Sequence, residues 1–164
     1  MNTVIRKGCF ETNSSSVHTL VISKEGLEPS NLKIEKNGKI RVPLRYWGKE
    51  YGEYTSQLDK LSYICTRAWY ANSGRYDSRY INENEDNYVL RLIEEAICDY
   101  TGSEGLELYI PPVEDENWDE YPGFDHQTVP EYSDDMNGFC SVWNPDSILN
   151  FVFNKYISFT TGCD

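Results

Sequence analysis

Apolar and polar residues alternate on both sides of the dipeptide Asn37-Gly38. The alternation predicts a β-hairpin over residues 32–44, because both turn positions tolerate the positive φ values of a tight turn. Pro43 restricts the second strand to a sheet edge or a strand end. Other short apolar runs bounded by turn residues predict strands over residues 17–23, 106–110, 138–143 and 156–160.

Apolar residues recur every three or four positions in three further segments, which is the period of an amphipathic helix. The predicted helices cover residues 56–71, 83–100 and 146–155, with N-caps at Ser56, Asn82 and Asn144. Gly102 is the predicted stop of the second helix. This order of elements predicts an α+β fold, a single domain over residues 1–164, with a mostly antiparallel sheet packed by about three helices.

Charge is divided unevenly along the chain, whose net charge is −12. No Lys or Arg occurs between Arg91 and Lys155. Many of the carboxylates fall in an aromatic-rich excursion over residues 111–137. Such a segment either keeps the protein soluble or binds a basic partner, since spaced carboxylates can imitate a phosphate backbone in a nucleic-acid channel. The candidate binding carboxylates are Asp115, Glu116, Asp119 and Glu120.

The predicted hairpin is basic, and tyrosines and a tryptophan follow it. Cations next to aromatic rings can hold phosphates and stack bases, so Lys39 and Arg41 are candidate RNA contacts. Charged residues also protect edge strands from aggregation, and this alternative explains the same pattern without a ligand.

The densest group of chemically active side chains lies between Arg6 and His18. His18 can act as a general base or acid near neutral pH, and Arg6 can bind an anion. A carboxylate and a run of hydroxyls lie beside them. Candidate catalytic residues are therefore Arg6, Glu11, Ser14, Ser16 and His18, with Asn13 and Ser15 as binding residues. The alternative is a polar turn whose side chains only satisfy backbone groups.

The five cysteines are widely spaced and form no Cys-x-x-Cys pair. They predict reduced thiols in a cytoplasmic protein, with no metal site and no cofactor. No apolar run reaches the roughly 18 residues that would predict a membrane span. A membrane is therefore not among the expected partners.

The block Arg6-x-Gly8-x-Phe10-Glu11-Thr12-Asn13-Ser14-Ser15-Ser16-x-His18 resembles the N-terminal signature of a family of small proteins from bacteria and their phages. The C-terminal segment, residues 156–164, is similar to that family's ending. The resemblance implies a phage or mobile-element origin and carries no specific activity.

Two functional hypotheses follow from the charge division, the polar block and this resemblance. The first is an anti-CRISPR-like inhibitor in the host cytoplasm, which binds a host defence nucleoprotein through its acidic surface and contacts RNA through its basic residues. The second is a metal-independent enzyme that processes RNA or a nucleotide, a nuclease or transferase whose site is the turn from Glu11 to Ser16 together with His18. An accessory protein without a catalytic site is the third option. The sequence does not fix the oligomeric state.

Overall fold

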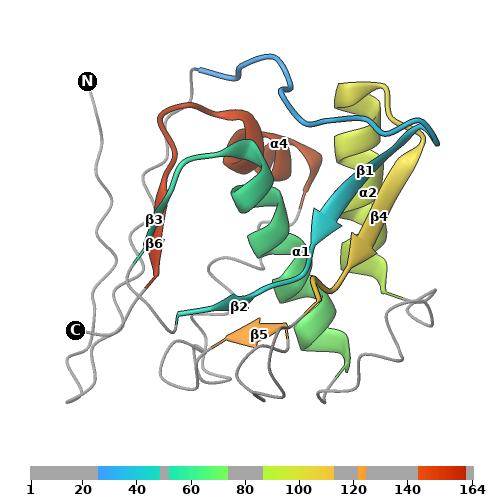
Figure 1. The fold of residues 1–164 in the computed structure, drawn as a ribbon. Coiled ribbons are helices and arrows are strands. Elements are labelled where there is room, and N and C mark those ends of the chain that lie inside the picture. Colours follow the sequence, from blue (N-terminus) through green and yellow to red (C-terminus); the bar gives the residue numbers. More distant parts are fainter. Residues whose placement is uncertain (1–25, 49–51, 74–86, 113–121, 125–143, 162–164) are drawn as a thin grey trace.

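A computed structural model describes residues 26–48, 52–73, 87–112, 122–124 and 144–161 (Figure 1). Within these ranges it contains three helices and six short strands, which confirms the α+β class. In chain order the elements are β1 (Lys39–Pro43), β2 (Tyr46–Trp47), β3 (Gly52–Tyr54), α1 (Gln57–Ser73), α2 (Tyr88–Thr101), β4 (Gly105–Tyr109), β5 (Gly123–Phe124), α4 (Pro145–Phe153) and β6 (Phe159–Thr161). The strands predicted over residues 17–23 and 138–143 lie outside the described ranges.

The described strands form three separate pairs, and two of these pairs are parallel. β1 runs parallel to β4, and β2 runs parallel to β5. Only β3 and β6 are antiparallel, with Gly52 opposite Thr161. The prediction of a mostly antiparallel sheet is therefore wrong. The physical reason is the connection, because α1 and α2 lie in the sequence between the partners of each parallel pair, and a long crossover of this kind is what parallel strands require.

The turn at Asn37-Gly38 is present, but only its second half leads into a strand. Gly38 donates its backbone N–H to Glu35 O (3.0 Å), and Glu35 donates to Lys39 O (2.8 Å). Gly38 alone in this turn has a positive φ, 78°. The loop is therefore a three-residue turn with a glycine bulge, and not the two-residue turn that the dipeptide favours.

The prediction that the residues before Asn37 form a strand is wrong, because they contribute only a single bridge, between Ile34 and Ile40. Further along the chain, side chains of α1 bind backbone groups at the end of β1 and just after it. Ser62 Oγ donates to Pro43 O, and the N–H of Arg45 donates to Thr66 Oγ1 (3.2 Å). Pro43 is the last residue of β1, as its missing N–H predicts.

Local capping chemistry explains where the helices begin and end. Asn144 accepts from Ser147 N (3.0 Å), and Pro145 takes the first helical position of α4, as predicted. Gly102 ends α2 with φ 74°, also as predicted. The predicted cap Asn82 is wrong, because α2 begins at Tyr88 and Asn87 accepts from Leu90 N (3.0 Å).

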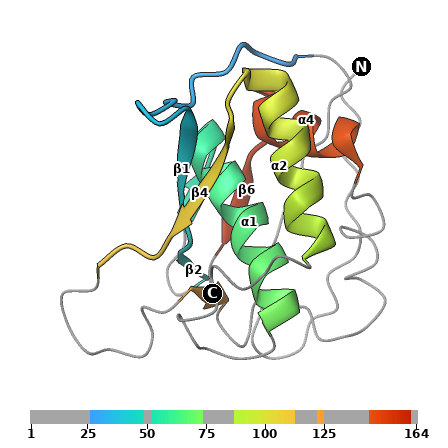
Figure 2. The ribbon, with the colours of Figure 1, turned by 90° about the vertical axis from the view of Figure 1, so that its right-hand side faces the viewer.

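Helix α1 is the centre of the described fold. It lies between the β1–β4 pair and the β3–β6 pair, with β2 and β5 near its C-terminal half (Figure 1). The view in Figure 2 shows α1 and α2 on the same side of β1 and β4. Residues 60–69 of α1 are buried on every side of the helix, polar ones included. One contiguous core surrounds them, and its largest buried apolar side chains include Trp69, Phe153, Ile40, Leu44, Leu61, Ile64, Ile93, Ile97 and Ile157.

Candidate functional site

Of the site residues predicted from sequence, Lys39 and Arg41 lie in the part of the chain that the structure describes. The others lie outside the described residues and stay predictions: Arg6, Glu11, Asn13, Ser14, Ser15, Ser16, His18, Asp115, Glu116, Asp119 and Glu120. The site is therefore built from the strand that carries the two cations, and from the described residues that flank the acidic excursion.

Lys39 and Arg41 project from the exposed face of β1, while Ile40 and Val42 between and beside them face the core. Across the parallel register, Arg41 lies opposite Glu107 of β4, and their Nε and Oε1 atoms are 3.2 Å apart. The Arg41 guanidinium also lies 4.2 Å from the centre of the Tyr109 ring. Arg41 thus already has an anionic and an aromatic partner within the fold.

This face is mixed in charge. Lys33 is paired with Glu35 (2.7 Å), and Glu107 accepts a second bond, from Asn37 Nδ2 (3.1 Å). Such alternating charges suit an exposed strand that must not pair with another chain. The geometry therefore favours protection of the strand against aggregation, over phosphate binding, as the role of the charges on the predicted hairpin.

Three described positions, one within the acidic excursion and one on each side of it, are fixed to the core. Residues 110–112 follow β4 directly, and β5 interrupts the excursion at Gly123 and Phe124. Gly123 donates its N–H to Arg45 O (3.1 Å), and Phe124 is 4% exposed. Asn144, at the far end, caps α4. The acidic segments 113–121 and 125–143 therefore each begin and end on the folded core.

Aromatic packing explains why β5, a strand of only two residues, is held in place. The Phe124 ring packs edge-on against Tyr63 (5.5 Å between ring centres) and Tyr70 (5.9 Å) of α1. The Arg67 guanidinium lies 5.3 Å from the Phe124 ring centre. Edge-to-face pairs of this kind add about 0.5–1.5 kcal/mol each beyond the area they bury.

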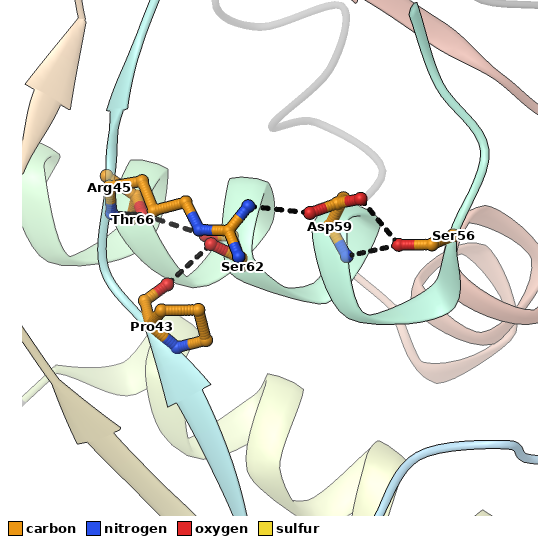
Figure 3. Close-up of polar contacts among 6 residues, drawn as sticks. All are labelled: Pro43, Arg45, Ser56, Asp59, Ser62 and Thr66. Carbon is orange, nitrogen blue, oxygen red and sulfur yellow. Dashed lines mark hydrogen bonds and ion pairs between the residues drawn. The ribbon is translucent and has the colours of Figure 1, made fainter. Parts of the chain in front are cut away.

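A polar cluster connects the start of α1 to the chain between β1 and β2 (Figure 3). Ser56 accepts from Asp59 N (3.0 Å), and its hydroxyl donates back to Asp59 Oδ2 (2.6 Å), which confirms the predicted cap. The other oxygen of Asp59 binds Arg45 Nη1 at 2.7 Å. The cluster fixes the direction in which β2 leaves β1, and thereby the position of β5 beside it.

Lys60 is a buried cation in the middle of the fold, 1% exposed. Its Nζ donates to Asn154 O (2.9 Å) and to Ile157 O (3.3 Å), which lie just after α4. Desolvation by burial lowers the pKa of Lys60 from 10.5 to about 8, and the nearby negative charge of Glu28 opposes that change. Lys60 thus ties α1 to the end of α4, where residues 26–28 also pair with residues 153–155.

The described residues offer little for nucleophilic or metal chemistry. Cys65 is fully buried, and burial raises the pKa of its thiol well above the ordinary value, with Glu94 adding to the effect. A thiol in this state is a poor nucleophile.

No cluster of His, Cys, Asp and Glu suited to a metal ion occurs within the described ranges. None of the helices described there is long and apolar enough to cross a bilayer.

Sequence patterns missed the residues that organise this region. Lys60 and Arg67 lie in a helix whose apolar positions predict a single buried face, and that pattern gives no signal that either side chain is buried. Glu107 follows an apolar residue in a short strand, and only the register with β1 reveals its bond to Arg41. The order of charges along the chain gives no signal for such pairs.

Comparison with known proteins places this chain in no group: no family model, no curated protein and no solved structure matches it.

Proposed function

We propose that this protein is a phage or mobile-element inhibitor, which binds the basic nucleic-acid channel of a host defence nucleoprotein and acts in the manner of an anti-CRISPR protein. The observation that carries the proposal is the location of the negative charge. The described residues hold nine Lys or Arg and ten Asp or Glu, so most of the net charge of −12 comes from the rest of the chain. Residues 113–143 alone contain nine carboxylates and no Lys or Arg.

The anchoring of this segment supports a binding role over a solubilising one. A solubilising tail needs only charge, whereas the chain here returns to the core at Phe124, which is buried among aromatic rings. Returning to the core divides the acidic sequence into stretches of nine and nineteen residues, and a shorter stretch between fixed ends loses less entropy on binding. Carboxylates spaced along such a stretch can displace the phosphates of a nucleic acid from a cationic groove.

The test is neutralisation of four carboxylates, in the variant Asp115→Asn, Glu116→Gln, Asp119→Asn and Glu120→Gln. A panel of purified, guide-loaded CRISPR effector complexes serves as the probe, and displacement of labelled target DNA is measured at several salt concentrations. The proposal expects inhibition by the wild type, loss of it in the variant, and a weaker salt dependence of whatever binding remains.

A matched control removes four charges elsewhere. Glu53, Glu95, Asp99 and Asp146 are exposed on the described elements, and their amide variants together change the net charge by the same amount. This control should inhibit as the wild type does. If both variants inhibit as well as the wild type, the proposal of channel binding is wrong. If both lose inhibition equally, the inhibition depends on net charge and not on the position of the carboxylates.

The enzymatic alternative depends on the segment from Glu11 to His18. Within the described ranges, Cys65 and Lys60 are buried and are not exposed nucleophiles. Incubation with labelled RNA in the presence of a chelator tests this alternative, and His18→Ala should then abolish cleavage. Full cleavage by that variant would contradict the assignment of His18.

A further inference from the structure

The turn between Lys36 and Lys39 contains the residue pair most prone to spontaneous deamidation, Asn37-Gly38, and Asn37 is exposed to solvent. In this reaction the Gly38 nitrogen loses its proton and attacks Asn37 Cγ. The Cγ–Nδ2 bond breaks, and Nδ2 leaves as ammonia with the released proton. The resulting succinimide takes up water at either carbonyl and opens to aspartate or isoaspartate. Water is the sole co-reactant.

Both reacting groups are engaged in the folded protein. The attacking nitrogen, that of Gly38, donates its N–H to Glu35 O at 3.0 Å. The carboxamide of Asn37 is held from both ends, since Oδ1 accepts from Lys39 N (3.1 Å) and Nδ2 donates to Glu107 Oε2 (3.1 Å). Only this orientation of the amide satisfies a backbone donor and a carboxylate acceptor together.

Space around the turn is also restricted. The Glu104 carboxyl group approaches so closely that a Cβ on Gly38 would lie 2.6 Å from it, and Gly38 has a φ of 78°. The N–H of Glu104 donates to Gly38 O at 2.8 Å. The turn is thus held by Glu104 just before β4 and by Glu107 within it, and these contacts oppose rotation of its backbone toward ring closure while β4 is docked.

We propose that Asn37 is a latent deamidation site guarded by β4, with Glu107 as the side chain that restrains its carboxamide. Opening of β4 from β1 releases the carboxamide of Asn37 and the backbone of the turn from these restraints. The product carries a carboxylate where Asn37 Nδ2 lay 3.1 Å from Glu107 Oε2, so two negative charges would face each other when β4 returns. A transient opening is thereby converted into a permanent covalent change in the turn.

The experiment incubates the full-length protein at pH 8 and 37 °C, followed by digestion and mass spectrometry of the peptide that contains Asn37. The folded wild type should deamidate at least about tenfold more slowly than the same protein in denaturant, because only the open fraction reacts. Asn137-Gly138, in the same digest, confirms that the chemistry proceeds in the denatured sample. Equal rates in the folded and the denatured protein would overturn the proposal without any variant.

Three variants separate the restraint by Glu107 from general effects. Glu107→Ala should raise the rate in the folded protein several-fold. Arg41→Gln, which removes the ion pair but leaves the bond between Glu107 and Asn37, should not change it. Glu95→Ala removes an exposed carboxylate of α2 and controls for charge. A Glu107→Ala protein that is folded by circular dichroism and deamidates at the rate of Glu95→Ala would refute the role of Glu107.

Discussion

Replacement of the buried Lys60 by Met tests the energetics of the centre of the fold. Met removes the ammonium group but keeps a side chain of similar length. Two effects oppose each other at neutral pH. The variant no longer buries a charge, and it leaves the carbonyls of Asn154 and Ile157 without the bonds from Lys60. Asn154 O keeps its bond from Ile157 N (3.2 Å). A buried carbonyl that loses its donor costs about 1–3 kcal/mol, so the burial and hydrogen-bond effects oppose each other at pH 7.

The pH dependence, in contrast, has a definite sign. The pKa of Lys60 is about 8 in the folded protein, below the value of 10.5 that it has when exposed. Between these two pH values the unfolded chain binds more protons than the folded one, so stability rises with pH. From pH 7 to pH 10 this linkage amounts to about 2–3 kcal/mol in favour of the wild type. The neutral amine retains two N–H groups, enough for both carbonyls.

The assay is urea unfolding of the wild type and Lys60→Met at pH 7 and pH 10, because both proteins share every other titrating group. The free-energy difference, wild type minus variant, should increase by about 2–3 kcal/mol at the higher pH. Lys36→Met removes an exposed lysine and should show no such increase. An unchanged or decreasing difference for Lys60→Met would refute the claim that burial dominates the pKa of Lys60.

Three further substitutions test the remaining elements by urea unfolding. Asn87→Ala should lower the free energy of unfolding by about 2 kcal/mol, because it removes the α2 cap and the bond to the buried Ala68 carbonyl (2.9 Å); Asn87→Ser, which retains a cap acceptor, should lose less. Gly102→Ala should cost about 1 kcal/mol from the left-handed backbone alone, since nothing lies within 4 Å of the new Cβ; a loss above about 3 kcal/mol would indicate a clash. Phe124→Ala should cost about 3 kcal/mol, and a loss below about 1 kcal/mol would contradict the anchoring of β5.

A helix end could be predicted from sequence where a single residue type determines it. Gly102 and Asn144-Pro145 were placed correctly, because a left-handed residue and a first-turn proline have few alternatives. The start of α2 was misplaced, since Asn82 and Asn87 are the same residue type. Asn87 is distinguished by its bond to Ala68 O, which forms only when α2 packs against α1.

Strand pairing and the candidate site were less accessible from sequence. β2, β3 and β5 contain two or three residues each, too few to show a period. The partner of β1 lies in a distant part of the chain, and no local pattern distinguishes it from the adjacent arm of the hairpin. Arg41 was recognised as a cation on an exposed strand, whereas its neutralisation by Glu107 depends on the register of that distant pairing.

The parallel pairing of β1 with β4 also has a consequence for synthesis of the chain. Lys39 pairs with Gly105, so β1 leaves the ribosome roughly 65 residues before its partner, a delay on the order of 3 to 13 seconds at ordinary rates of synthesis. Throughout that interval the strand is open to other nascent chains. Lys39 and Arg41 place charge along it, and Pro43 removes one N–H from its edge. These residues therefore protect the strand during translation, before the fold that later pairs them exists.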